Sequence, residues 1–411
     1  MNLEYFIARR LVTAKNYKSS ISAPIIKIAT VAIAIGVIMM IMSVATGVGL
    51  QDKIREKLSA FNGHVIISGF DDNESEVSVR PVSIKQDFYP KFTKVQGINH
   101  VQAVASKAGI IRTAETFEGI IFKGVGKEYK WDELQEYIVK GRIPNLKRAL
   151  NSEVIISQYL ADRLKLKVGD KFNTYFMKEG GNGLPNLRVF EIVGIYNSGF
   201  RDFDATYVIG DIRHVQRINK WKPWQVGSFE VFLDEFSQID EKGTEIYEAI
   251  PSLLNSKTIK EKYNNIFEWL TLFDFNIALI IIIMTIVATI NMIVALLVLI
   301  LERTQMVGML KALGATNWSV RKVFLYNAAY IIAKGLLWGN GISLAMILIQ
   351  KYFQVVKLPP ESYYVTVAPV IIDVPAILLI NVGTIIVCLL LLLVPSYIIT
   401  RISPVKALRF D

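Results

Sequence analysis

The sequence predicts an α-helical integral membrane protein with four transmembrane helices and a large extracytoplasmic α/β domain, built of two subdomains, between the first and second spans. Of its 411 residues, 52% are hydrophobic and 20% are charged, which is too apolar for an ordinary soluble protein. Four apolar runs are each long enough to cross a bilayer, since about 20 helical residues span roughly 30 Å. The region 62–265 contains no such run and mixes strand-like with helix-like patterns.

Positive charge is concentrated beside the apolar runs. Residues 50–265 contain 31 Lys and Arg against 29 Asp and Glu, and the rest of the chain contains 15 against 7. Lys and Arg next to spans mark the cytoplasmic side, so the net charge of +10 indicates orientation in a membrane and not nucleic-acid binding. Both termini are therefore expected in the cytoplasm. The single cysteine, Cys388, and three scattered histidines suggest neither a disulfide nor a metal site.

The order of the segments follows from the apolar runs and the loops between them. Residues 25–50 are too long for the apolar core of a signal peptide, and a helical pattern continues them to Phe61 as a stalk. In order, we expect a cytoplasmic interfacial helix (1–20), the first span with its stalk (21–61), the external α/β domain (62–256), a stalk with the second span (257–301), a cytoplasmic helix (302–322), the third span (323–350), an external loop (351–374), the fourth span (375–400) and a cytoplasmic tail (401–411).

Within the external domain, runs rich in β-branched residues alternate with helical patterns. The expected strands are 64–68, 101–112, 120–124, 154–157, 188–196, 206–210 and 228–233. The expected helices are 82–95, 131–140, 158–164, 211–217 and 236–254, and a further helical stretch from 257 to 272 leads into the second span. The Gly- and Asn-rich stretch 178–186 is expected to protrude as a loop.

One short polar stretch, 302–316, lies between the second and third apolar runs. Four of its apolar residues follow the helical spacing i, i+3, i+4, i+7 and predict one apolar face. Gly314 is expected to end this helix. The spacing alone leaves open whether the stretch binds a partner or only connects two spans. The four residues of the apolar face are Met306, Met309, Leu310 and Leu313.

This stretch resembles the coupling helix of the ABC transporter permeases shared by the lipoprotein-releasing complex, the macrolide exporter and the cell-division permease. The end of the chain, Ser403 to Arg409, is similar to the closing motif of that family. The resemblance implies that the helix docks on a separate cytoplasmic ABC ATPase dimer, which binds ATP and Mg²⁺, and that this chain has no cofactor, metal or catalytic residue. The implied docking residues are Glu302, Arg303, Met306, Met309, Leu310, Lys311 and Leu313.

Within that family, the chain is most similar to the lipoprotein-releasing permeases, because stretches 193–204 and 358–365 follow their pattern. The resemblance implies a bacterial inner-membrane complex with a second, homologous or identical, permease subunit and lipoprotein substrates. It also implies a periplasmic lipoprotein carrier that binds the 178–186 loop, where Leu184 and Pro185 are the matching residues. Alternatives are a mechanotransmission permease for another substrate or for cell-wall regulation, and a membrane-anchored scaffold that transports nothing.

Two groups of apolar residues are candidates for a substrate cavity. A face of small residues and Met on the first span suits lipid contact, helix packing or an apolar substrate equally well. A second group, rich in aromatic residues, lies at the mouth of the second span. The candidate residues are Ile38, Met42, Ala45, Gly49, Phe267, Leu270 and Phe273.

The third span carries one charged residue and a pair of glycines. Lys334 is either functional or extends its ammonium toward the headgroups. Gly335 and Gly339 have the spacing that allows close helix packing. The stretch Gly124-Val125-Gly126-Lys127 lacks the spacing and the following Ser or Thr of a phosphate loop, so we expect no nucleotide site.

Overall fold

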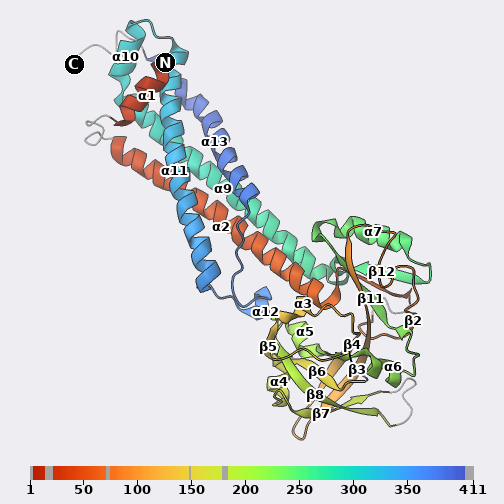
Figure 1. Ribbon diagram of the computed structural model, residues 1–411. Coiled ribbons are helices and arrows are strands. Elements are labelled where there is room, and N and C mark those ends of the chain that lie inside the picture. Colours follow the sequence, from red (N-terminus) through yellow and green to blue (C-terminus); the bar gives the residue numbers. More distant parts are fainter. Residues whose placement is uncertain (1–2, 14–21, 71–74, 148–149, 178–183, 403–411) are drawn as a thin grey trace. The chain divides into compact units, whose positions relative to one another are not determined.

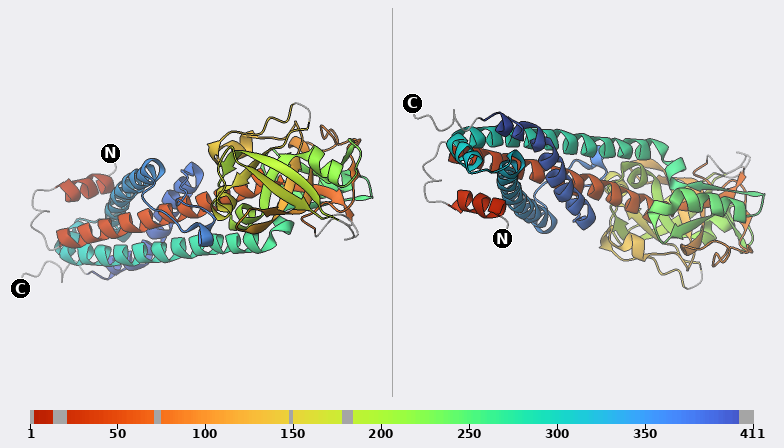
Figure 2. Two further views of the ribbon diagram at one scale, coloured as in Figure 1. Left: turned by 90° about the horizontal axis from the view of Figure 1, so that it is seen from below. Right: turned by 90° about the horizontal axis from the view of Figure 1, so that it is seen from above.

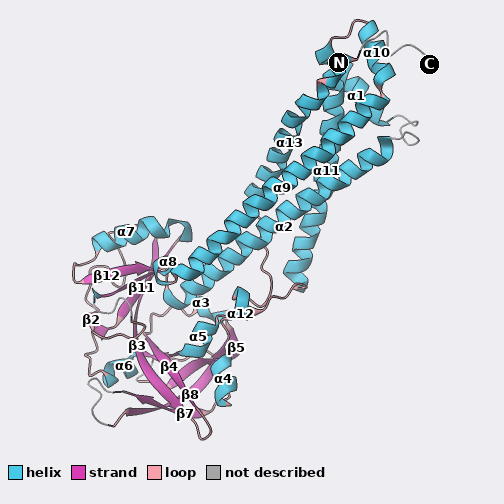
Figure 3. Ribbon diagram, turned by 180° about the vertical axis from the view of Figure 1, so that it is seen from behind, coloured by secondary structure: helices cyan, strands magenta, loops and turns pink. Residues whose placement is uncertain are grey.

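The computed structural model describes residues 3–13, 22–70, 75–147, 150–177 and 184–402 of the protein. The chain forms two compact units (Figure 1). The helical unit comprises Met1–Gln51, Trp269–Val356 and Val367–Asp411, and the α/β unit comprises Asp52–Glu268 and Lys357–Thr366. Every strand labelled in Figure 3 belongs to the α/β unit. The closing motif 403–409 lies outside the described residues.

Four long apolar helices, each able to cross a membrane, dominate the helical unit and confirm the four expected spans. Runs of Leu, Ile, Val and Ala favour their helical conformation in an apolar environment, because every backbone group is then hydrogen-bonded within the helix. The helices of this unit are α1 (Leu3–Thr13), α10 (Thr304–Ala312), α11 (Asn317–Phe353), α13 (Val374–Ser396) and α14 (Ile398–Arg401), together with most of α2 (Ser22–Asn62) and of α9 (Asn264–Glu302), each of which has one end in the α/β unit.

The long helices of this unit run alongside one another (Figure 2), and small and polar residues lie where they meet. A Cβ atom on Gly335 would lie 2.7 Å from Ile33 Cγ2, and one on Gly339 would lie 2.8 Å from Val37 Cβ, so α11 packs directly against α2. The prediction that this glycine pair serves close packing is therefore confirmed. Asn340 of α11 and Asn381 of α13 exchange amide hydrogen bonds of 2.7 and 3.0 Å.

The α/β unit is built on one ten-stranded sheet of order β12-β1-β11-β3-β4-β9-β6-β8-β5, and β7 pairs with both β3 and β8. Two pairs, β4 with β9 and β6 with β8, are parallel. The strands are β1 (Val65–Gly69), β3 (Ile98–Arg112), β4 (Phe117–Val125), β5 (Ile138–Gly141), β6 (Glu153–Ser157), β7 (Lys171–Phe176), β8 (Asn186–Tyr196), β9 (Tyr207–Asp211), β11 (Ser228–Leu233) and β12 (Leu254–Thr258), with a small separate pair of β2 (Val82–Ser83) and β10 (Gln225–Val226).

The α/β unit is one compact unit on this single sheet, so the two expected subdomains do not form separate units. Strand β3 is 15 residues long and pairs with β11 through its first half and with β7 through Gly109 to Arg112. The helices of the unit are α3 (Asp132–Gln135), α4 (Gln158–Leu164), α5 (Arg201–Thr206), α6 (Ile212–Ile218), α7 (Ile239–Ala249), α8 (Ile259–Lys262) and α12 (Pro360–Tyr363). Helices α4 and α6 begin at side-chain caps, Ser157 and Asp211, as their sequences favour.

Four helical predictions for this region differ from the structure. The stretch 82–95 contains only the short strand β2 and turns, because Pro90 interrupts any helix and Phe88 and Phe92 are buried anchors. The stretch 131–140 is divided between α3 and β5. Residues 254–258 form β12 because they pair with β1, so the helix expected over 236–254 ends at Ala249 and the stretch 257–272 begins in a strand.

Helix α2 continues without a break to Asn62, as the helical pattern after the first apolar run predicts. Residues 52–62 of this helix belong to the α/β unit, where Ile54, Leu58 and Phe61 are buried. The ring of Phe61 stacks on Phe203 at a centroid distance of 5.3 Å. The last turn of α2 is therefore part of the core of the α/β unit.

Candidate functional site

Helix α10 joins α9 to α11 and has well-defined ends (Figure 1). Its C-terminal stop at Gly314 is confirmed, since this residue has a φ of +93° and the next amide, of Ala315, donates to Leu310 O at 2.9 Å. Thr316 then caps α11 by accepting a hydrogen bond from Ser319 N at 3.2 Å. The segment is thus a rigid helix with short connections to the second and third spans.

The predicted apolar face of α10 is divided between two environments. Met306 and Leu310 are half-buried and pack against the core of the helical unit. Met309 and Leu313 are 54% and 84% exposed. Both side chains are therefore available for contact with a partner. The exposed pair is hereafter called the α10 surface, and Glu302, which is exposed, and Arg303, which is half-buried, precede it.

Lys311, the remaining residue of the implied docking set, points into its own chain. Its ammonium donates to Ile399 O at 2.6 Å and to Ile402 O at 2.9 Å, and it lies 3.5 Å from Thr400 O. Burial of the ammonium lowers the pKa of Lys311 from its ordinary value. The acceptors are carbonyl oxygens at the C-terminal end of α14, where Ile399 O also accepts a hydrogen bond from Ile402 N at 3.3 Å.

A second cation of the same region also binds the fourth span. Arg321, in the first turns of α11, donates to Ser396 Oγ at 3.0 Å and to Leu393 O at 2.8 Å. Pro395 lies between these two acceptors and removes one backbone donor from the end of α13. The C-terminal end of the fourth span is therefore held by side chains from α10 and α11.

The candidate cavity residues of the first span lie on α2. Ile38 and Met42 are half-buried, and Ala45 and Gly49 are buried. Ala45 O accepts a hydrogen bond from Ile371 N at 3.1 Å, and a Cβ atom on Gly49 would lie 2.9 Å from Pro369 O. The segment before α13 therefore covers one end of this face.

The three candidate cavity residues near the second span belong to different compact units. Leu270 and Phe273 belong to the helical unit, where Leu270 is buried and Phe273 packs edge-on against Trp269 at 4.9 Å. Phe267 belongs to the α/β unit and stacks on Phe236 at 5.9 Å. Lys334 is exposed on α11, and its extension toward the headgroups remains a prediction.

Sequence reasoning missed an exposed apolar face on β3, β7 and β8. Pairing places Ile110, Tyr175 and Leu187 in one cross-strand row, and Val189 follows two residues later on the same face. Ile110, Leu187 and Val189 are 41–48% exposed. In β8, Leu187 and Val189 lie on one face and Arg188 and Phe190 on the other, so the sequence alone does not show which face is exposed. Leu184, 84% exposed, precedes β8, whereas loop residues 178–183 lie outside the described residues.

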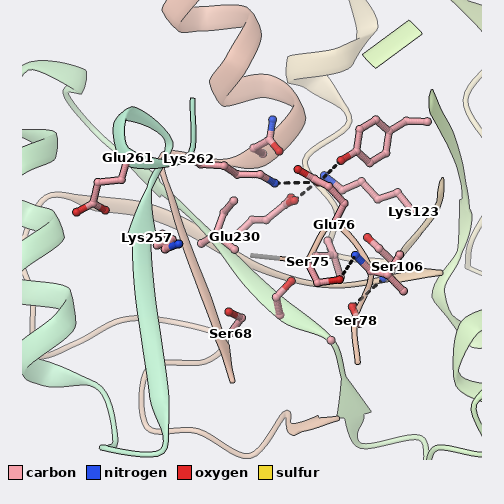
Figure 4. Close-up of a pocket in the computed structure, with 17 residues that line it drawn as sticks. Ser68, Ser75, Glu76, Ser78, Ser106, Lys123, Glu230, Lys257, Glu261 and Lys262 are labelled. Carbon is pink, nitrogen blue, oxygen red and sulfur yellow. Dashed lines mark hydrogen bonds and ion pairs between the residues drawn. The ribbon is translucent and has the colours of Figure 1, made fainter. Parts of the chain in front are cut away.

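A polar cavity of about 360 Å³ lies in the α/β unit (Figure 4). At its floor the buried Lys123 Nζ lies 2.5 Å from Glu230 Oε1 and also donates to Phe61 O at the end of α2. Burial lowers the pKa of Lys123, and the charge of Glu230 opposes this effect. Nearby, Glu76 pairs with Lys262 at 3.1 Å. These charges neutralise one another and anchor the stalk to the sheet.

Two family models match the chain. The MacB-like periplasmic core domain matches residues 28–241, and the FtsX-like permease C-terminal domain matches residues 278–404. Together with the four spans and the α/β domain between the first two, these matches define a non-catalytic, multi-pass membrane permease with an extracytoplasmic domain. The chain belongs to the FtsX- and MacB-like permeases of ABC transporters.

Curated relatives extend the similarity over the full length. The chain is 21% identical to the lipoprotein-releasing system transmembrane protein LolC of Xylella fastidiosa, over 100% of this chain and 99% of the relative. It is 23% identical to LolC of Neisseria meningitidis serogroup B, over all of both chains. It is 20% identical to LolE of Haemophilus influenzae, over 84% of this chain and 83% of the relative. This similarity supports a permease of the Lol type.

Proposed function

We propose that this chain is a permease subunit of an ABC transporter that extracts lipoproteins from the bacterial inner membrane for transfer to a periplasmic carrier and the outer membrane. A separate cytoplasmic ATPase dimer binds ATP and Mg²⁺ and supplies the energy. Both termini and α10 lie in the cytoplasm. The observation that carries this proposal is the full-length similarity to lipoprotein-releasing permeases, which includes the α10 segment and the whole external domain.

The α10 surface is the proposed contact with the ATPase. FtsX-family permeases pair with ABC ATPases, and a docking contact needs apolar side chains that are exposed before the partner binds. Met309 and Leu313 meet this condition, while Met306 and Leu310 fix the helix to the core of the helical unit. A force applied to the α10 surface is therefore transmitted to the spans through packed side chains.

Extraction requires an apolar path for the acyl chains. Each buried CH₂ group of a lipid anchor contributes about 0.8 kcal/mol, so a triacylated protein leaves the bilayer only if its chains remain covered. We place this path between α2 and α9 of two permease subunits, homologous or identical. Because Pro369 to Ile371 cover Ala45 and Gly49, the path opens at this end only when that segment moves.

The carrier is proposed to bind the apolar face of β3, β7 and β8 together with Leu184 and Pro185. A carrier that shields acyl chains needs a docking surface on the external domain, and this face exposes apolar side chains in a continuous cross-strand row.

Replacing Leu313 by Asp tests the docking surface. The protein, co-expressed with a candidate ABC ATPase from the same organism and purified in mild detergent, is expected to retain the ATPase. The Leu313→Asp variant is expected to lose most of it, because the substitution places a charge in an apolar contact. Leu253→Asp is the matched control, since Leu253 is 82% exposed but lies in the α/β unit.

Release of a triacylated lipoprotein from proteoliposomes, with ATP, the ATPase and a carrier present, tests the transport function. The unmodified protein is expected to release the lipoprotein, and Leu313→Asp is expected to release little. The proposal is wrong if no ATPase is retained by the unmodified protein and if depletion of the protein leaves lipoproteins at their normal membrane.

A further inference from the structure

We propose that Lys311 is a positioning residue that joins α10 to the end of the fourth span, so that movement of α10 is passed to α13 as well as to α9 and α11. This inference rests on the proposed function for its consequence in transport, but the joint itself is a property of this chain. It differs from the role implied by the family resemblance, in which Lys311 contacts the ATPase.

The geometry of the ammonium carries the inference. Lys311 Nζ faces three backbone carbonyl oxygens, of Ile399, Thr400 and Ile402, at 2.6, 3.5 and 2.9 Å. An ammonium has three donors and suits such a cluster. The C-terminal end of a helix also carries a partial negative charge that favours a cation. Among the described residues, no carboxylate forms an ion pair with Lys311, so the end of α14 is its binding partner.

The joint matters because α10 is not connected to the fourth span by a short stretch of chain. Helix α10 is linked covalently to α9 through Arg303 and to α11 through the turn at Gly314. The fourth span has no such link, because 88 residues separate Lys311 from Ile399. Among the described residues, Val307 of α10 and Ile399 of α14 also belong to one apolar core, so Lys311 adds a polar contact to apolar packing between these helices.

Apolar contacts and charge-assisted hydrogen bonds transmit displacement differently. Apolar packing resists displacement through interlocked side chains, but the hydrophobic effect itself has no preferred direction. A charged donor held on carbonyl oxygens is directional, and it resists both separation and sliding. Lys311 therefore fixes the relative position of α10 and α14, and Arg321 fixes the start of α11 to the same span at Leu393 O and Ser396 Oγ.

The joint is tested first without any partner. Spin labels at Met309→Cys and Ile398→Cys, both exposed positions, report the distance between α10 and α14 in a Cys388→Ser background. We expect one narrow distance distribution with Lys311 and a broadened or shifted one in Lys311→Met, which keeps the apolar stem but removes the donors. Lys311→Arg is expected to restore the narrow distribution, since guanidinium groups also donate to carbonyl oxygens.

Lys322→Met is the matched control for this measurement. Lys322 is another half-buried lysine near α10, and it pairs with Glu4 of α1 at 3.9 Å. Replacing Lys322 should therefore leave the distribution of distances between the spin labels unchanged. An unchanged, narrow distribution in Lys311→Met would overturn the proposed joint.

The second test distinguishes a joint within this chain from a docking contact with the ATPase. Lys311→Met is expected to bind the ATPase as tightly as the unmodified protein. It should release roughly tenfold less lipoprotein per ATP hydrolysed, the effect of losing about one charge-assisted hydrogen bond. Lys311→Arg should recover most of this loss. If Lys311→Met instead weakens ATPase binding as Leu313→Asp does, Lys311 is a docking contact. If no ATPase binds the unmodified protein, the proposed function is wrong. The spin-label distances then still show whether Lys311 joins α10 to α14.

Discussion

His64 shows how one buried residue makes the α/β unit sensitive to pH. It follows the stalk directly, and its Nδ1 accepts a hydrogen bond from Leu233 N at 3.0 Å, which requires the neutral ring. The imidazole packs against Phe232 and Phe236. Burial in these surroundings lowers the pKa of His64 to about 4, and the weaker charge effects of Glu133 and Lys130 oppose each other.

We expect the α/β unit to lose stability as the pH falls from about 6.5 to about 4. Over this range the unfolded chain binds a proton at His64 and the folded chain does not, so the free energy of unfolding decreases by up to about 3 kcal/mol. Hydrogen exchange of β1 and β11 in the full-length protein, measured between pH 7.5 and 4.5, checks this expectation.

The variant His64→Gln isolates the effect, because the Gln carbonyl accepts the same hydrogen bond but does not titrate. The free energy of unfolding of His64→Gln should depend less on pH than that of the unmodified protein. If the free energy of unfolding falls equally steeply with pH in His64→Gln and in the unmodified protein, other groups cause the acid sensitivity.

At the scale of elements, the packing of α11 against α2 depends on the glycine pair Gly335 and Gly339. Gly335→Leu is expected to destabilise the helical unit by about 1–3 kcal/mol, the usual cost of overpacking. The better helix propensity of Leu would by itself add less than about 1 kcal/mol of stability, so packing determines the sign. The thermal unfolding temperature in detergent checks the prediction.

The same helix supplies the control. A Cβ atom on Gly341 would meet no atom within 4 Å, so Gly341→Leu should leave the unfolding temperature unchanged or raise it slightly. If both substitutions lowered the unfolding temperature equally, the loss of stability would come from the backbone and not from the contact with α2.

At the scale of the whole molecule, the distribution of Lys and Arg predicts the orientation in the membrane. The single native cysteine, Cys388, is buried, so cysteines introduced elsewhere can be labelled with little background. Leu184→Cys is expected to react with a membrane-impermeant maleimide in intact spheroplasts, and Leu313→Cys only after the membrane is permeabilised. The reverse pattern would place both termini and α10 on the outer side.

The sequence by itself determined those features that depend on neighbours along the chain. Apolar run length specified the four spans, and helical spacing with Gly314 specified α10. Alternation of side chains located most strands of the sheet. Each of these signals is local, because a helix or turn satisfies its backbone groups within a few residues.

Only the tertiary structure decided the features that depend on residues far apart in the sequence. Residues 254–258 became a strand because β1 offers an edge to pair with, and Lys123 is buried because Glu230 and the end of α2 receive its charge. Met309 and Leu313 share a predicted face with Met306 and Leu310, yet only the first pair is exposed. The sequence marked Lys311 as basic, but its partner, the end of α14, is 88 residues away. No periodicity encodes such contacts, because they are selected by packing and by the need of buried charges and carbonyl groups for partners.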